Sequence, residues 1–461
     1  MGMEKNNSKV NMAGNSGKGR AQFATKLGVI AATVGSAVGL GNIWRFPYEA
    51  GMHGGGAFLL VYVLFVIVLG IPVICAEFVL GRASHQNAAG AFRVLGGGKL
   101  WPAVGYMGIL SSFLILGFYS VVAGWTLDYI FASVSGSLSS GDSDVMHQRF
   151  DAFTHDSARQ LIWTGLFLAI NFLVISRGVQ KGIEKISNLL MPLLFVILIA
   201  FCVNALFMPK AAKGFEFLFR PDFSQLTPKA VLGAMGQAFF SLSVGMGVLM
   251  TYASYFSKET PLIKTASTTA LLDTMVAVMA GMIIFPAVFS FGQEPTAGPR
   301  LVFEVLPAIF SNMPAGMLWS TLFFILLFVA SLTSTISLSE TVIAYCQEDL
   351  KMSRGKATLC EAIGVCVLSA LSALSFGPLR DFHIFGMTFF DFLDFITASV
   401  LMPLGGMFIS IYAGWKLKKS QLHEQLQSGE RKDKFMIAFV TFCLRYMAPV
   451  AIGAIFVFGL L

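Results

Sequence analysis

Two short segments of the chain combine small residues and hydroxyl groups in a way that could bind a charged small molecule. One runs from Gly35 to Asn42 (GSAVGLGN) and the other from Phe240 to Gly247 (FSLSVGMG), each in the middle of an apolar stretch. Small residues at such places are also typical of close packing between membrane helices. However, paired glycine-interrupted segments in the two halves of a membrane protein favour a binding site between two broken helices.

A helix that breaks between Gly39 and Gly41 would offer groups for both charges of an amino acid. The part that restarts near Gly41 presents free amides and the positive end of its dipole, which suit a carboxylate. Carbonyl groups released just before the break, at Gly35, Ala37 and Val38, suit a cation. The first segment therefore predicts a site for a zwitterion beside a site for a cation.

Several polar residues fall at membrane depth. Glu77, Asp273 and Glu340 lie inside apolar stretches, and hydroxyls cluster between Thr333 and Ser339. A charge at the bilayer centre costs about 2.5–3.5 kcal/mol, so these acids need partners. Hydroxyl and carbonyl ligands favour hard ions such as sodium. All six histidines lie in loops or near the ends of apolar stretches, which favours sodium coupling over a histidine proton relay.

The chain has the composition of an integral membrane protein. It is 56% hydrophobic and only 12% charged, against about 25% charged in an average soluble domain. Backbone groups in lipid must be satisfied within the segment, so long apolar segments predict helices. We expect an all-α integral membrane fold with eleven transmembrane helices, near 24–50, 56–80, 101–131, 160–176, 186–207, 230–256, 262–290, 315–347, 357–373, 389–414 and 435–460.

Basic residues in the loops predict how the chain crosses the membrane. Most of the 32 Lys and Arg residues fall on the side that holds the N-terminus, which indicates a cytoplasmic N-terminus in a multi-pass protein of the cell (inner) membrane. Because they sit in short loops, the net charge of +7 does not indicate a nucleic-acid partner. The predicted parts are a cytoplasmic N-terminal segment (1–22), a first five-helix repeat (23–210), an inverted second five-helix repeat (211–415), a cytoplasmic loop (416–434) and an eleventh helix (435–461). The first helix of each repeat, which is helix 1 or helix 6 of the chain, is expected to be broken.

Three motifs carry a resemblance to a known family. GNIWRFP at 41–47, GGGAF at 54–58 and GQAFFSLS at 236–243 resemble the neurotransmitter:sodium symporters, over about nine-tenths of the chain. The bacterial leucine transporter and the multi-hydrophobic amino-acid transporters look nearest. The resemblance implies an L-amino acid as substrate, two sodium ions as cofactors and a lipid bilayer around the protein.

The same resemblance implies a set of site residues. The substrate site would comprise Ser36, Ala37, Gly39, Leu40, Gly41, Ile115, Tyr119, Phe240, Ser241, Ser243, Met246, Ser334 and Leu338. The first sodium site would use Ala37, Asn42, Ser241 and Asp273, and the second Gly35, Val38, Ala330, Thr333 and Ser334. Arg45 with Asp394 would form an outer gate, and Arg20 with Glu348 an inner one. Glu77 would brace the broken helices.

Two departures from the family pattern narrow the range of substrates and ions that we expect. Gly39 stands where monoamine carriers have an aspartate, so the substrate should bring its own carboxylate, which favours amino acids over amines. Asp273 stands where chloride-dependent relatives have an asparagine, and its charge could replace chloride, so that no chloride is expected. Arg445, about ten residues into the last segment, shows no partner in the sequence, and we expect a partner or a water cavity there.

The sequence therefore predicts a sodium-coupled symporter of neutral hydrophobic or aromatic L-amino acids that works by alternating access. The alternatives are a proton-coupled or exchange carrier on the same fold, and an amino-acid sensor that does not transport. An enzyme is not expected, because no nucleophile and base are paired at membrane depth. The sequence leaves open the physiological amino acid, the sodium stoichiometry, a role for chloride or protons, and the oligomeric state.

Overall fold

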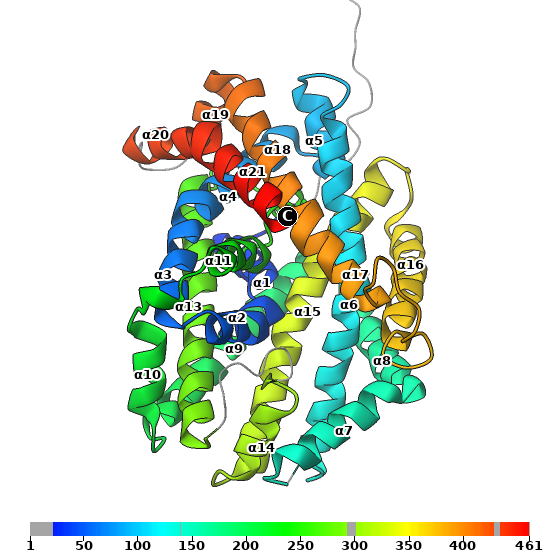
Figure 1. The fold of residues 1–461 in the computed structure, drawn as a ribbon. Coiled ribbons are helices and arrows are strands. Elements are labelled where there is room, and N and C mark those ends of the chain that lie inside the picture. The colour runs from blue at the N-terminus through cyan, green and yellow to red at the C-terminus, as the bar shows by residue number, and fades with distance from the viewer. Residues whose placement is uncertain (1–21, 139, 293–300, 428–433, 461) are drawn as a thin grey trace, which may run out of the picture.

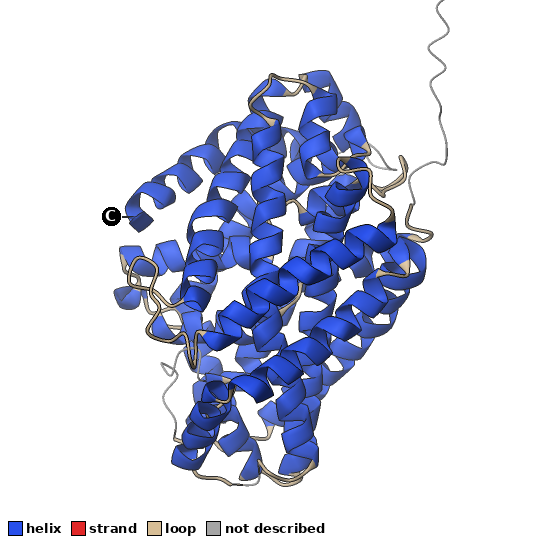
Figure 2. Cartoon of the chain, turned by 90° about the vertical axis from the view of Figure 1, so that its right-hand side faces the viewer, coloured by secondary structure: helices blue, strands red, loops and turns tan. Residues whose placement is uncertain are grey.

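The computed structural model describes residues 22–138, 140–292, 301–427 and 434–460, and within these ranges the chain is helical (Figures 1 and 2). The described residues contain no strand and only two isolated bridges, which join Gly55 to Pro221 and Ile384 to Met387. Within these residues nine helices are long and apolar enough to cross a membrane, and a further pair, Lys26–Ala37 and Gly41–Met52, forms a crossing bent by 48°.

Helices occupy all eleven predicted segments. The first five crossings are α1 (Lys26–Ala37) with η1 (Gly41–Arg45) and α2 (Phe46–Met52), α3 (Gly56–Phe65) with η2 (Val66–Gly70) and α4 (Ile71–Ser84), α6 (Pro102–Val134), α8 (Ser157–Ile175), and η3 (Val179–Glu184) with α9 (Lys185–Leu206). The next five are α11 (Pro228–Ser241) with α12 (Val248–Ala253), α13 (Leu262–Ser290), α15 (Gly316–Glu348), α16 (Arg354–Leu374), and α17 (Phe389–Phe395) with η6 (Ile396–Leu401), α18 (Met402–Ile411) and η7 (Tyr412–Lys416). The last is α20 (Lys434–Phe442), η8 (Cys443–Met447) and α21 (Ala448–Leu460).

Several short helices lie between the predicted membrane segments, where no helix is predicted. They are α5 (Ala88–Leu95), α7 (Ser143–His155), α10 (Ala211–Phe219), η4 (Phe223–Gln225), α14 (Val305–Ser311) and α19 (Lys419–Leu426). One end of the bundle carries α5 and α19, and the opposite end carries α7 and α14 (Figure 1). We call these ends the α5 face and the α7 face.

The first and sixth crossings are both interrupted within their length. α1 ends at Ala37, where Val38 takes an extended conformation, and the helix resumes in η1 at Gly41. α11 ends at Ser241 and α12 begins at Val248. Both breaks lie where the glycine pattern predicts them.

Gly245 shows why the second break needs glycine. Its φ is +86°, a conformation that side chains rarely adopt, and an added Cβ would lie 2.3 Å from the Met402 carbonyl oxygen. The chain between α11 and α12 therefore passes close to α18 only because this position has no side chain. The sequence of the segment thus dictates the local backbone path.

Two long helices form the wall on one side of the breaks. α6 and α15, of 33 residues each, pack along one another, and α8 and α16 pack on their far side. Figure 1 shows α1 and α11 near the middle of the bundle, with α3 and α13 opposite α6 and α15. The breaks are therefore enclosed by helices on both sides.

The fifth crossing contains a glycine and a proline, Gly182 and Pro192, between which the helix could unwind, but this segment is helical in the structure. Gly182 lies in η3 and Pro192 lies inside α9, and the chain is helical through both. A π-helical turn marks its start. Unwinding between these two residues stays a prediction for another conformation.

Candidate functional site

A small cavity lies where the two helix breaks face each other. Its lining contains most of the residues predicted for the substrate site: Ser36, Ala37, Gly39, Gly41, Ile115, Tyr119, Phe240, Ser243, Met246, Ser334 and Leu338. Two of the predicted residues lie elsewhere. Leu40 lines the adjoining vestibule, and Ser241 bonds to Asp273.

Backbone groups of the first break point at polar partners. The Leu40 amide donates to the Tyr119 hydroxyl at 2.9 Å, and the Gly39 amide donates to Asn42 Oδ1 at 3.0 Å. The Ser243 hydroxyl crosses from the second break and donates to the Ser36 carbonyl at 2.8 Å. The two breaks are therefore joined by a hydrogen bond between their own residues, and the amides of the restarting helix lie at the cavity.

Gly39 leaves the space that this arrangement needs. A Cβ there would lie 2.6 Å from Ser334 Oγ and 2.7 Å from the Tyr119 hydroxyl oxygen. Any side chain at position 39, acidic or not, would therefore enter the polar end of the cavity, and glycine keeps that space open.

A cluster of oxygens surrounds Asn42 just beside the cavity. Asn42 Nδ2 donates to Asp273 Oδ1 at 2.7 Å and to Ser241 Oγ at 2.8 Å, and Ser241 donates to Asp273 Oδ2 at 2.6 Å. Tyr62 reaches the same carboxylate at 3.4 Å. These side chains are fully buried, and their donor atoms suit a hard cation rather than a soft one. Tyr62 was not among the predicted residues, because an aromatic residue within an apolar helix carries no pattern of its own.

The residues predicted for a second cation site also come together. The Ser334 hydroxyl donates to the Val38 carbonyl at 3.2 Å. Gly35 faces Thr333, because a Cβ added to Gly35 would lie 3.4 Å from the Cβ of Thr333. Thr333 Oγ1 donates to the Ala330 carbonyl at 3.1 Å. Carbonyls next to the first break and hydroxyls of α15 therefore meet beside that break.

Glu77 holds the second break in place. Its carboxylate accepts the Gly245 amide at 2.8 Å and the Met250 amide at 3.2 Å, and the side chain is fully buried. Amides at the start of a helix have no partner within the helix, so an acid there supplies the missing acceptor. These contacts join Glu77 to the second break, and a role at the first break stays a prediction.

A wider vestibule lies between the cavity and the α7 face. Its volume is about 450 Å³, and Tyr119 and Phe240 line both spaces. Arg45 Nη1 lies 4.0 Å from Asp394 Oδ1, and the Arg45 guanidinium lies 4.7 Å from the centre of the Phe240 ring. The predicted outer pair is therefore brought together directly over an aromatic residue of the cavity.

The predicted inner pair can be followed only in part. Arg20 lies outside the described residues, whereas Glu348 Oε2 accepts the Asn87 backbone amide at 2.6 Å and its Nδ2 at 3.0 Å. Nearby, Glu184 accepts the Ala24 amide at 2.9 Å and the Thr25 hydroxyl at 2.9 Å. Glu184 was missed because it stands just outside the predicted fifth helix, where an acid is usually an ordinary loop-end charge.

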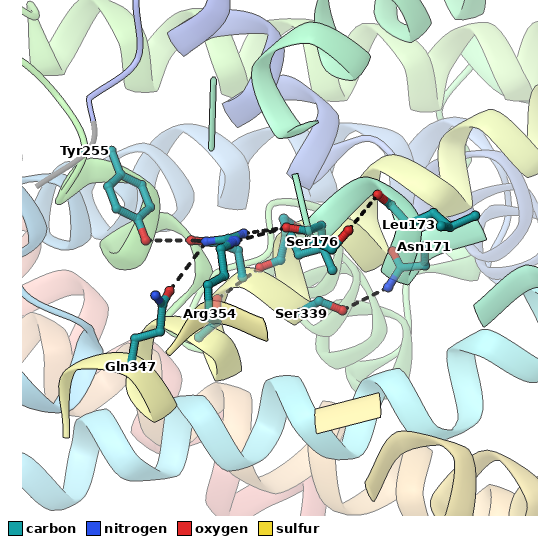
Figure 3. Close-up of polar contacts among 11 residues, drawn as sticks. Asn171, Leu173, Ser176, Tyr255, Ser339, Gln347 and Arg354 are labelled. Carbon is teal, nitrogen blue, oxygen red and sulfur yellow. Dashed lines mark hydrogen bonds and ion pairs between the residues drawn. The ribbon is translucent and has the colours of Figure 1, made fainter. Parts of the chain in front are cut away.

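Glu340 finds its partner at the α5 face. Arg354 Nη2 lies 2.6 Å from Glu340 Oε2, and the Tyr255 hydroxyl donates to Glu340 Oε1 at 2.6 Å. Arg354 also donates twice to the Ile175 carbonyl at the end of α8, at 2.7 and 3.1 Å (Figure 3). Its sequence position alone, in a short loop between two apolar segments, indicates nothing more than a basic residue that contributes to orientation.

Arg445 also has a partner, as expected from its position. Its Nε donates to the Gly414 carbonyl at 2.7 Å, and its guanidinium lies 5.7 Å from the Trp415 ring centre. Burial, together with Lys419 and Arg445, lowers the pKa of His423 on α19. Arg445 therefore caps the last turn of η7 among the cations of the α5 face.

An all-helical membrane bundle in which two broken helices meet at a central polar cavity defines a secondary transporter. The chain belongs to the sodium:neurotransmitter symporter family, whose model matches residues 20–160 and 146–461. It is 40% identical to an uncharacterized sodium-dependent transporter of Bacillus subtilis, YhdH, over 94% of this chain and 96% of that protein. An uncharacterized sodium-dependent transporter of Haemophilus influenzae is 37% identical, over 96% of this chain and 99% of that protein.

A solved structure shares the whole fold. The crystal structure of MhsT in complex with L-phenylalanine matches with a TM-score of 0.90 and 44% identity, over 95% of this chain and 99% of that chain. The likeness extends the family assignment from the sequence to the arrangement of the helices.

Proposed function

We propose that this protein is a sodium-coupled symporter that moves neutral hydrophobic or aromatic L-amino acids across a cell membrane by alternating access. One observation carries the proposal. The Leu40 amide and the Tyr119 hydroxyl meet at one end of a cavity, and the oxygens of Asn42, Ser241 and Asp273 lie beside that end. A carboxylate and a cation placed there would stabilise each other.

The substrate would lie with its charged end between the helix breaks. Its carboxylate would meet the Leu40 and Gly41 amides and the Tyr119 hydroxyl. Its ammonium would meet the carbonyls of Ala37 and Phe240. The side chain would enter the apolar part of the cavity, which is lined by Ile115, Phe240, Met246 and Leu338. The L-phenylalanine in the MhsT complex supports a ligand of this class.

Two sodium ions would bind at the two oxygen-lined places. Asn42, Ser241 and Asp273, with the Ala37 carbonyl, would hold the first. The carbonyls of Gly35, Val38 and Ala330 with the hydroxyls of Thr333 and Ser334 would hold the second. We propose that the charge of Asp273 takes the place of chloride, so that transport needs no chloride.

Alternating access would move the broken helices against a fixed wall. We propose that the two repeats at 23–210 and 211–415 supply the moving parts, α1, α4, α11 and α13, and that α6, α8, α15 and α16 stay together. The pair Arg45 and Asp394 would close the α7 face. The α5 face would be the cytoplasmic one, since it carries most of the basic loop residues.

Uptake into proteoliposomes tests the proposal. A panel of labelled amino acids is offered with and without an inward sodium gradient, and we expect uptake of apolar and aromatic L-amino acids only with the gradient. Uptake that persists without sodium but collapses with a pH gradient would indicate a proton-coupled carrier instead. Binding without flux would indicate a sensor, and preference for acidic or basic amino acids would refute the pocket assignment.

A further inference from the structure

Glu361 is a buried acid with no role in the site described above. It lies on α16, two turns after Arg354, and is 2% exposed. Within the described part of the chain, neither oxygen of its carboxyl group has a hydrogen-bond partner. A buried ionised carboxylate without donors is strongly unfavourable, and such a group commonly takes up a proton instead.

In the described part of the chain, Arg354 is the cation that acts on Glu361, and it is fully engaged by other groups. A guanidinium has five N–H donors, and Arg354 uses all five. Two go to the Ile175 carbonyl, two to the carboxylate of Glu340 and one to Gln347 Oε1 (Figure 3). Arg354 therefore neutralises Glu340 and has no donor left for a second acid.

The remaining neighbours of Glu361 are neutral groups. The Ser339 hydroxyl of α15 faces the carboxyl group without reaching hydrogen-bond geometry, and it accepts from Asn171 of α8 at 3.0 Å. Glu340 and Arg354 are the charged groups that act on Glu361, and no charged group of α6, α8 or α17 in the described chain does so. The titratable thiols around it are Cys346 of α15 and Cys360 and Cys366 of α16.

Arg354 sits where several segments of the α5 face are tied together. It joins α16 to the end of α8 through Ile175 and to α15 through Glu340, which also accepts from Tyr255. The backbone of Tyr255 accepts the Phe23 amide at 3.2 Å, which holds the described start of the chain. An opening of this face that separates these segments would release donors of Arg354 and admit water to the seam between α15 and α16.

We propose that Glu361 is a proton-binding site coupled to the α5 face. With this face closed, Arg354 is taken by Glu340 and Glu361 carries a proton. When the face opens, Glu361 releases the proton to water on that side and pairs with Arg354. The inference rests on the alternating access proposed above. By linkage, acid on the α5 side then holds that face closed and slows release of substrate there.

The test measures sodium-driven uptake of labelled L-phenylalanine into proteoliposomes while only the internal pH changes. Vesicles with the α5 face inside are selected by protease protection. Between an internal pH of about 6 and about 8 we expect the initial rate of the unmodified protein to rise about threefold or more, since one titrating group can change an occupancy by up to about tenfold per pH unit. E361Q, which imitates the protonated side chain, should show a flat profile within about 1.5-fold over the same range.

Matched variants separate this proton site from general damage. E361D keeps a titratable group and should keep the slope, and E424Q, which alters an exposed acid on α19, should behave as the unmodified protein does. Because no hydrogen bond to Glu361 is lost, E361Q should elute and melt as the unmodified protein does. If E361Q keeps the original profile, or if internal acid speeds uptake, the inference fails. If the unmodified protein shows no sodium-driven uptake of any amino acid, the proposed function itself fails.

Discussion

Tyr119→Phe removes one hydroxyl from the polar end of the cavity. In the structure this oxygen accepts the Leu40 amide at 2.9 Å, and Ser334 is its other polar neighbour, so its own proton can donate to Ser334 or to a ligand in the cavity that Tyr119 lines. The proposed recipient is the substrate carboxylate. The substitution keeps the ring, which packs in a buried position, and therefore isolates the hydroxyl.

The expected loss can be worked from these contacts. A hydrogen bond to a charged group contributes about 1.5–3 kcal/mol, and its removal alone would weaken binding by about 10- to 150-fold. The Leu40 amide, however, loses its own acceptor in the variant and becomes free to donate to the carboxylate. That compensation places the effect at the low end, near 1.5–2 kcal/mol, or about a 10- to 30-fold rise in Kd.

Equilibrium binding of a labelled amino acid to purified protein at saturating sodium measures this change. Tyr129→Phe is the matched control, since Tyr129 lies on the same helix, is fully buried, and has a hydroxyl without a hydrogen-bond partner in the described chain. It should leave Kd within about twofold of the original. A Tyr119→Phe protein that folds and binds as tightly as the control would refute the carboxylate position. An equal loss for a ligand without a carboxylate would refute it too.

Three further substitutions test other parts of the site. Glu77→Gln keeps one acceptor but turns an N–H donor toward a buried backbone amide. It should lower the free energy of unfolding by about 2–3 kcal/mol. The melting temperature should therefore be lower than that of Glu216→Gln, a control at an exposed site. Asp273→Asn should raise the sodium concentration for half-maximal uptake about tenfold. Chloride, but not gluconate, should bring that concentration part of the way back. An unchanged sodium dependence would contradict the assignment. Gly39→Ala should weaken amino-acid binding about tenfold, because its Cβ would lie 2.6 Å from Ser334 Oγ. Adding Ser334→Ala should restore part of the lost affinity. Unchanged affinity in Gly39→Ala would contradict the close contact at this position.

The helix breaks could be predicted from the sequence because their cause is local. Gly245 must adopt a positive φ and lie against the Met402 backbone, and only glycine does both readily. Hydropathy located the helical segments for a similar reason, since a crossing must be apolar along its own length. The described helices include ten such crossings, and the remaining predicted segment holds the two shorter helices α11 and α12 on either side of the second break. The short helices of the loops escaped prediction. α7, for example, is a polar helix capped by Asp142, and its packing on α8 and α14 distinguishes it from an ordinary loop.

Partners across the bundle could not be predicted in the same way. Glu184 binds the backbone of Ala24 and Thr25, about 160 residues earlier, and nothing in the neighbouring sequence marks that contact. Arg354 looked like an ordinary loop cation because its salt bridge depends on how α15 and α16 pack. The residues of the central cavity could be named through resemblance to a family, but residue patterns alone predicted only the two breaks and the need for partners.

The buried acids of the bundle differ in how their charge is satisfied, and the difference points to what each can do. Glu77 is held by two backbone amides, so its partners cannot leave without breaking the helix, and it suits a fixed brace. Asp273 is surrounded by neutral donors and acceptors that could turn toward a cation, and it suits a binding site. Glu340 is held by side chains of other segments, Arg354 and Tyr255, and suits a contact that forms and breaks when those segments separate. Within the described chain the Glu361 carboxyl group has no hydrogen-bond partner, so an event that frees Arg354 should change its protonation more than that of the other three acids.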